Sequence, residues 1–108
     1  MNPAQVFRVT SDSDFSVRFW GVRGSIACPG EETALYGGNT PCVEIRCGSR
    51  LFVFDAGTGL RNLGKSIAKD GITDVDLFLS HTHVDHIVGL PFFCYAFKPG
   101  NTLRVWSG

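Results

Sequence analysis

The stretch Ser80-His81-Thr82-His83-Val84-Asp85-His86 decides how this sequence is interpreted, because it holds all three histidines of the chain. Imidazole nitrogens and carboxylate oxygens are common donors to Zn²⁺ and related ions, and they must converge at about 2.0–2.2 Å from the metal. Side chains two residues apart in an extended segment point to one side, so His81 and His83 are predicted to bind one ion. Asp85 and His86 should face another way and bind a second ion nearby.

The flanking residues predict that the histidines follow a strand. Val75-Asp76-Leu77-Phe78-Leu79 is a short apolar run typical of a buried strand, and a helical turn is expected over residues 87–90. The histidines would then lie at the carboxyl end of a strand, where open α/β sheets bind their ligands. The alternative is a polar loop without a ligand, but the donor types and their spacing favour a metal site.

Hydrophobic patterning predicts an α/β fold in which a β-sheet packs against helices. The runs that predict further strands are residues 6–9, 15–19, 42–47, 50–54 and 103–106, with a turn at 11–14. Gly48-Ser49 joins two of these runs as a hairpin. The run 50–54 is apolar on both faces, which predicts a central strand.

One amphipathic helix is predicted after the second strand of that hairpin. The residues that repeat at helical spacing are Leu60, Leu63, Gly64, Ile67 and Ala68. Thr58 is the predicted N-cap and Gly71 the predicted stop. Further along, the aromatic residues of the segment 92–97 are expected in the core or on an association surface, with a substrate wall as the alternative.

Two glycine-rich segments have competing interpretations. Residues 21–41 are rich in glycine and proline, so they form either part of an active-site mouth or a simple surface connection. Arg23 in this loop could meet an anionic substrate, although a lone loop arginine is more often solvated. Asp55-Ala56-Gly57-Thr58-Gly59 lacks the lysine and the glycine spacing of a phosphate-binding loop. We expect instead a tight strand-to-helix turn, in which Asp55 hydrogen-bonds backbone or a metal ligand.

These motifs together resemble one protein family. His81-Thr82-His83-Val84-Asp85-His86 resembles the H-x-H-x-D-H signature of the metallo-β-lactamase-fold hydrolases, in particular their phosphodiesterase-like members. Three other segments are similar to the first half of that subfamily: Phe19-Trp20-Gly21-Val22-Arg23-Gly24-Ser25, Tyr36-Gly37-Gly38-Asn39-Thr40 and Phe54-Asp55-Ala56-Gly57-Thr58-Gly59. The resemblance implies a mixed β-sheet with packed helices, the first half of an αββα sandwich.

The resemblance also implies a role for each site residue. His81 and His83 would bind metal at one site, and Asp85 and His86 at a second site. Asp85 would also orient the attacking water as a catalytic residue, while Asp55 would support the metal loop from behind the ligands. The implied cofactor is Zn²⁺, two ions per complete site, with Mn²⁺ or Fe²⁺ as alternatives, and the implied reaction is hydrolysis of a phosphoric diester by a metal-activated water.

Family members carry a later histidine, a bridging aspartate and a last histidine that have no counterpart up to Gly108. Residues 1–108 are therefore expected to form a single partial domain that lacks the C-terminal half, with weak or absent activity on its own. The alternative function is a non-catalytic module that folds by self-association and binds metal weakly or not at all.

Composition sets expectations for partners. Ten basic and ten acidic residues cancel, so no nucleic-acid-binding surface is evident, and the expected substrate is a small molecule or a phosphodiester. With 44% apolar residues, half a fold would leave sheet surface exposed, which predicts a homodimer or an exchange of elements between chains.

Cysteine usage and hydropathy predict a cytoplasmic protein with no membrane partner. The four cysteines form no C-x-x-C pair, and the chain shows neither a signal segment nor an apolar run near the ~20 residues of a membrane span. The thiols are therefore expected to be reduced. Cys42 and Cys47 are predicted to be buried strand thiols, with a metal-binding pair as the alternative.

Overall fold

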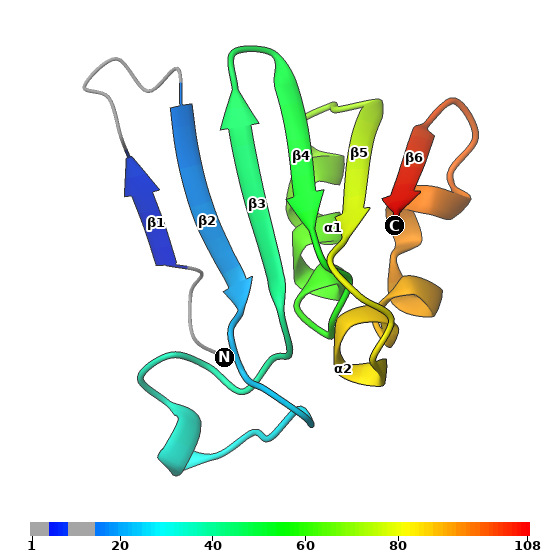
Figure 1. Ribbon diagram of the computed structural model, residues 1–108. Helices are drawn as coiled ribbons and strands as arrows, with labels where there is room; N and C mark the ends of the chain where they lie inside the picture. The colour runs from blue at the N-terminus through cyan, green and yellow to red at the C-terminus, as the bar shows by residue number, and fades with distance from the viewer. Residues whose placement is uncertain (1–4, 9–14) are drawn as a thin grey trace.

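The computed structural model describes residues 5–8 and 15–108, and it shows one six-stranded mixed sheet with strand order β1-β2-β3-β4-β5-β6 (Figure 1). The strands are β1 (Gln5–Arg8), β2 (Phe15–Gly21), β3 (Cys42–Cys47), β4 (Arg50–Phe54), β5 (Asp74–Leu79) and β6 (Thr102–Ser107). Neighbours from β1 to β4 are antiparallel, whereas β4, β5 and β6 run parallel. The expected mixed sheet with packed helices is confirmed.

The strand predictions hold where the structure describes the chain. β3 and β4 form the expected hairpin, in which Cys47 pairs with Arg50. The run 50–54 is central, because β4 has a strand on each side. The turn predicted at residues 11–14 falls outside the described residues. None of the helices in the described part of the chain is long and apolar enough to cross a bilayer.

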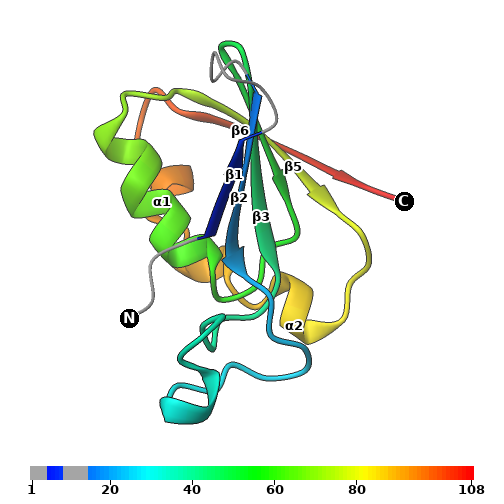
Figure 2. The ribbon, with the colours of Figure 1, turned by 90° about the vertical axis from the view of Figure 1, so that its left-hand side faces the viewer.

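Helix α1 (Leu60–Lys69) covers one face of the sheet (Figure 2). Its buried residues Leu60, Leu63, Gly64 and Ile67 are those predicted from the 3.6-residue period. Gly71 follows the C-cap with a φ of 71°, a left-handed conformation that glycine adopts without strain, so the predicted stop is correct. The predicted N-cap is wrong. Gly59 is the N-cap, and the Thr58 hydroxyl instead accepts a hydrogen bond from the Thr40 amide.

The core lies between the sheet and α1. It contains Cys42, Leu51, Val53, Ala56, Leu60, Leu63, Ile67, Val75, Leu77, Phe93 and Tyr95. Phe93 and Tyr95 come from the aromatic segment, through the 3₁₀ turns η2 (Leu90–Phe92) and η3 (Cys94–Phe97). A Cβ on Gly64 would lie 2.8 Å from the Phe93 ring, so glycine is required for this close packing of α1.

The strand thiols differ from each other. Cys42 is fully buried, and burial raises the pKa of its thiol far above the ordinary value, with the Glu44 and Asp55 carboxylates adding to the shift. Cys47 is exposed because it ends β3 beside the hairpin turn. The burial predicted for both thiols is therefore correct for Cys42 and wrong for Cys47, and all four cysteines are free.

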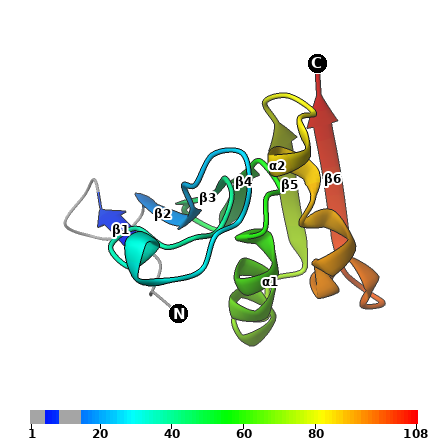
Figure 3. The same cartoon turned by 90° about the horizontal axis from the view of Figure 1, so that it is seen from below.

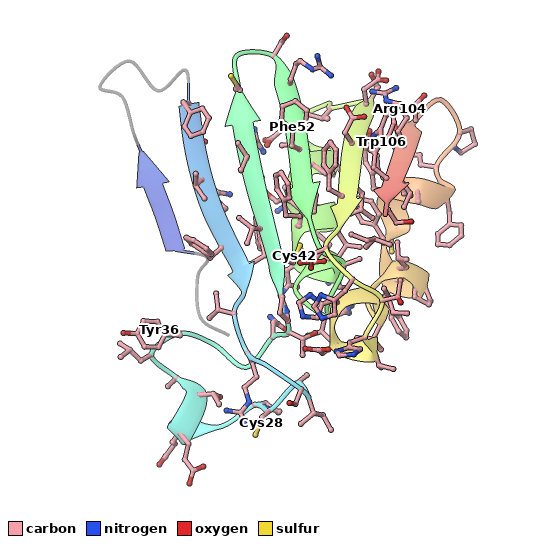
Figure 4. The ribbon with its side chains drawn as sticks, viewed as in Figure 1. Cys28, Tyr36, Cys42, Phe52, Arg104 and Trp106 are labelled. Carbon is pink, nitrogen blue, oxygen red and sulfur yellow. The ribbon has the colours of Figure 1, made fainter. Side chains whose placement is uncertain are left out.

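The opposite face of the sheet carries a row of aromatic side chains (Figure 4). Phe52, Phe54, Phe78 and Trp106 alternate along their strands with core residues, and the register places Phe54 beside Phe78 and Phe78 beside Trp106. Their ring centroids lie 5.2 Å apart for Phe54 and Phe78 and 6.2 Å apart for Phe78 and Trp106. Within the described residues no helix lies over the middle of this face, and Trp106 remains 53% exposed (Figure 2). We call these four residues the aromatic face.

Asp76 ties β5 to β6 beside the aromatic face. Its carboxylate accepts hydrogen bonds from the Arg104 guanidinium at 2.8 Å and from the Trp106 indole at 3.0 Å. These two hydrogen bonds, the one from Arg104 first, lower the pKa of Asp76 to about 2. An unfolded aspartate has a pKa of about 3.9. The ionised Asp76 carboxylate therefore stabilises the folded state fully above about pH 4, and this stabilisation is lost as the pH falls through the pKa of Asp76 in the folded protein.

We predict that Asp76→Asn lowers the thermal midpoint at pH 7 and that this deficit shrinks as the pH is lowered toward 2, where the wild-type carboxylate becomes protonated. Circular dichroism melts of both proteins across this pH range measure the difference. Asp74→Asn is the control, because that carboxylate is more exposed than that of Asp76 and pairs with Arg104 at 3.0 Å. A deficit that is independent of pH would contradict the assignment.

Candidate metal centre

The histidine stretch lies at the carboxyl end of β5, as predicted. β5 ends at Leu79, the chain continues without regular structure to His83, and the short helix α2 (Val84–Ile87) follows. The helix begins three residues earlier than the predicted turn at residues 87–90. Hydrogen bonds from the His86 amide to the His83 carbonyl and from the Val88 amide to the Val84 carbonyl close this turn. Asp85 and His86 are therefore helical, not extended.

This early helix brings three donors together. Ligand atoms of His81, Asp85 and His86 all lie within 4.8 Å of one another. The rings of His81 and His86 have centroids 3.8 Å apart. The sequence predicted that His81 would face away from Asp85 and His86 and bind a different ion. The structure instead brings the three side chains together. The reason is that the first turn of α2 reverses the chain, so residues 85 and 86 turn back toward the end of β5.

His83 lies beside this group but does not belong to it. Its ring packs edge-on against His81, with centroids 4.7 Å apart, and its backbone forms the N-cap of α2. His81 and His83 are therefore neighbours, as the extended spacing predicted, while the converging donor set contains only His81 of the two. His83 is exposed to solvent.

Asp55 holds the start of the histidine stretch. It follows β4 with a φ of 66°, a left-handed conformation that a few residue types such as Asp and Asn tolerate. Its Oδ1 accepts hydrogen bonds from the Ser80 amide at 2.8 Å and from the Ser80 hydroxyl at 2.9 Å. The expected contact of Asp55 with backbone is present, and it fixes the direction in which the chain leaves β5.

Ser80 extends this contact to His81. Its Oγ lies 2.8 Å from Asp55 Oδ2 and 3.0 Å from His81 Nδ1. The hydroxyl has a single proton and donates it in a hydrogen bond to the carboxylate, so Oγ is left to accept a hydrogen bond from His81 Nδ1–H. This arrangement favours the tautomer in which His81 Nε2 is unprotonated and available as a metal donor.

His86 lies between two carboxylates. Its Nδ1 is 3.1 Å from Asp55 Oδ2 and its Nε2 is 3.3 Å from Asp85 Oδ2. Asp55 thus contacts one ring of the donor group directly and another through Ser80. Backbone pairing fixes α2 to the same turn, because the Ala56 amide donates to the His86 carbonyl at 2.7 Å and the Gly89 amide donates to the Ala56 carbonyl at 2.8 Å.

Close backbone packing explains one glycine of this region. A Cβ on Gly89 would lie 2.0 Å from the Gly57 carbonyl oxygen, so any other residue would push α2 away from the turn after β4. Gly57 in turn donates its amide to the Pro41 carbonyl at 2.8 Å. The turn 55–59 is the expected tight connection from β4 to helix α1, and its backbone also holds α2 in place.

The loop between β2 and β3 reaches the same centre. Seen from below, this loop and α2 lie at the same end of the sheet (Figure 3). The Ser25 amide donates a hydrogen bond to Asp85 Oδ2 at 3.2 Å, although the two residues are 60 positions apart in the sequence. The interpretation of residues 21–41 as part of the site's mouth is thus supported for Ser25. The sequence patterns did not single out Ser25 or the side chain of Ser80. The unusual length of the loop 21–41 was the one signal that pointed to the region of Ser25.

Comparison with known proteins agrees with this fold. The sequence model of the metallo-beta-lactamase superfamily matches residues 35–103. A ribonuclease Z of Picrophilus torridus is 30% identical over 82 residues, which are 73% of this chain and 23% of the relative. The crystal structure of a diphosphatase from the PhnP family superposes with a TM-score of 0.50 and 16% identity, covering 94% of this chain and 42% of that one.

A mixed sheet that carries a histidine and aspartate cluster at a strand end defines an α/β protein with a candidate metal centre. The chain belongs to the metallo-β-lactamase superfamily. Members of this superfamily depend on metal, typically zinc. The chain spans about a quarter of the length of the curated relative it matches.

We predict that Asp55→Asn weakens zinc binding about 10–100-fold, because a residue that orients metal ligands from behind has an effect of this size. Asparagine tolerates the left-handed backbone, so the thermal midpoint should change much less than the zinc affinity. Competition titration with a zinc chelator measures the affinity, and the exposed Glu32→Gln is the control. Equal zinc affinity in Asp55→Asn and wild type would contradict the role of Asp55.

Proposed function

We propose that this chain contributes metal ligands to a metal-dependent hydrolase that acts on phosphoric diesters. The observation that carries the proposal is the convergence of ligand atoms from His81, Asp85 and His86 within 4.8 Å. Two imidazoles and a carboxylate are a typical donor set for Zn²⁺ at a catalytic site, where a further position stays open to water. His83, exposed beside His81, is the fourth proposed ligand.

The candidate ligand groups present lone pairs and a negative charge close to one another, which a bound cation would stabilise. His86 faces Asp55 on one side and Asp85 on the other, and its buried Nδ1 has no hydrogen bond of good geometry. The ring centroids of His81 and His86 lie 3.8 Å apart, and each neutral imidazole has one unprotonated nitrogen whose lone pair can bind a cation. A positive ion at the centre would satisfy these lone pairs and the Asp85 carboxylate together.

Each residue has a role in the proposed reaction. The bound metal would supply Lewis acidity and a lower pKa for the attacking water. Ser80 keeps His81 in the tautomer with Nε2 free, and Asp55 holds Ser80 and His86 in place. Asp85 would orient the water through the oxygen that the Ser25 amide does not occupy.

The phosphoric diester class is supported by the kinship with a ribonuclease Z, a protein named for acting on RNA. The balance of ten basic and ten acidic residues provides no strong field for a long nucleic acid, so affinity for a diester would depend on the metal centre itself. Turnover by this chain alone is expected to be weak. Three donors converge within the described residues, and these are too few to hold the two metal ions of a complete site.

We predict that the double change His81→Ala and His83→Ala abolishes stoichiometric zinc binding, measured by elemental analysis after dialysis. Singly, His81→Ala should lose more zinc than His83→Ala, because His81 belongs to the converging donors. Thr82→Ala, on the same segment, should bind zinc like wild type. Undiminished zinc in the double variant would overturn the metal assignment and favour a non-catalytic module.

We further propose that two copies of the chain associate through the aromatic face. Phe54 and Trp106 are 39% and 53% exposed there, and burying such side chains contributes about 25 cal/mol per Å² of apolar area. The charges at its edge are already neutralised within one chain, since Arg104 binds both Asp74 and Asp76. A second copy would therefore meet an apolar surface without like-charge repulsion, in a two-fold interface.

Light scattering across a dilution series tests this association, and we predict a dimer that dissociates on dilution. Phe54→Asp should shift the protein to monomer, because it places a charge on the aromatic face. The exposed Lys69→Asp, on the helix side, should leave the dimer intact. A wild-type protein that is monomeric at all concentrations would refute the proposal.

A further inference from the structure

A groove separate from the metal centre opens on the helix side of the sheet. It has a volume of about 1180 Å³ and lies between β2, the loop that follows it and the first turns of α1. The lining residues that matter here are Arg18, Trp20, Tyr36, Asn39, Arg61 and Asn62. His81, Asp85 and His86 are not among the residues that line it.

The groove carries two arginines that form no ion pair with any of the residues that the structure describes. Within the described residues, neither Arg18 nor Arg61 forms an ion pair, whereas Arg46, Arg50 and Arg104 all bind carboxylates. Glu31 is the one acidic residue among the described residues that line the groove, so its lining has a net positive charge. A guanidinium that lacks a carboxylate is suited to bind a phosphate through paired N–H groups.

An indole ring is held firmly beside these charges. The Trp20 Nε1–H donates to Glu44 Oε1 at 2.9 Å, and Glu44 is itself fixed by an ion pair with Arg46. The guanidinium carbon of Arg18 lies 5.3 Å from the Trp20 ring centroid. A cation next to a fixed aromatic ring provides both an electrostatic and a stacking partner for a planar group.

The loop that forms the outer wall is preformed. The Cys28 amide donates to the Gly38 carbonyl at 2.9 Å, and the Arg23 amide donates to the Asn39 carbonyl at 2.9 Å. Tyr36 extends from this wall with 69% of its surface exposed (Figure 4). A wall closed by its own hydrogen bonds requires little ordering when a ligand enters, which favours binding.

We propose that this groove binds a nucleotide, with the phosphate on Arg18 and Arg61 and the base beside Trp20 and Tyr36. The volume exceeds the usual range of about 300–1,000 Å³ for small-molecule sites. It therefore has room for a free mononucleotide or for a nucleotide unit of an RNA strand, and the two share the same recognising chemistry. The site is independent of the metal centre proposed above.

Isothermal titration of the 108-residue chain with AMP tests the proposal, in buffer with a chelator so that the metal centre plays no part. Arg61→Gln and Arg18→Gln should each weaken AMP binding about tenfold or more, the loss expected from one charge-assisted contact. Lys65→Gln, an exposed lysine of α1 outside the groove lining, should bind AMP like wild type. His81→Ala should also bind AMP like wild type, because His81 does not line the groove.

The base and the source of the nucleotide are distinguished with further probes. Ribose 5-phosphate should bind more weakly than AMP, and equal affinity would refute the role of the aromatic rings. An adenosine pentanucleotide that binds much more tightly than AMP, with the same loss in Arg61→Gln, would identify an RNA strand as the ligand. Equal affinity of the two would identify the free mononucleotide.

Three results would overturn the proposal. The first is the absence of AMP and pentanucleotide binding at millimolar concentration. The second is unchanged affinity in both arginine variants, which circular dichroism should show to be folded, since Arg61 is exposed. The third is loss of binding in His81→Ala but not in Arg61→Gln, which would place the ligand at the metal centre instead.

Discussion

The carboxylate of Asp55 is the contact on which the candidate metal centre depends. It receives the Ser80 amide and hydroxyl, it approaches His86, and through Ser80 it orients His81. One side chain thus connects the end of β4, the exit of β5 and the first turn of α2. The left-handed backbone at Asp55, with a φ of 66°, is the local strain that makes this possible. The contacts of the Asp55 carboxylate with Ser80 and His86 compensate for that strain. They also hold the candidate ligands His81 and His86 in fixed positions.

The two faces of the sheet have different surroundings. Its helix side is packed with α1, and the polar pair of Trp20 and Glu44 is anchored there beside the groove. Its other side presents the aromatic face, whose rings contact one another across three strands. The metal centre lies at the end of the sheet, where parallel strands β4 and β5 finish together. Because each surface occupies its own side or end, a ligand, a second copy and a metal could be bound without competing for the same residues.

Local patterns in the sequence were sufficient to predict most elements. The strands follow from runs whose alternation or apolar character matches burial on one or both faces, and the buried positions of α1 follow from the helical period. The identity of the candidate donors was equally visible, because three histidines and an aspartate lie within one short stretch. The predicted N-cap failed for a tertiary reason. The Thr58 hydroxyl is engaged by Thr40, a residue from a different strand connection, and not by its own helix.

The sequence by itself therefore determined the type of fold, the donors and their place after a strand, since these depend on composition and short-range periodicity. The tertiary structure decided which donors converge. The helix begins at Val84 because the backbone of Ala56 pairs with both His86 and Gly89 at the turn after β4, and this turns Asp85 and His86 toward His81. It also decided that Ser25 binds Asp85. Both outcomes depend on contacts between residues far apart in the chain, whose geometry is set only when the sheet and its loops pack together.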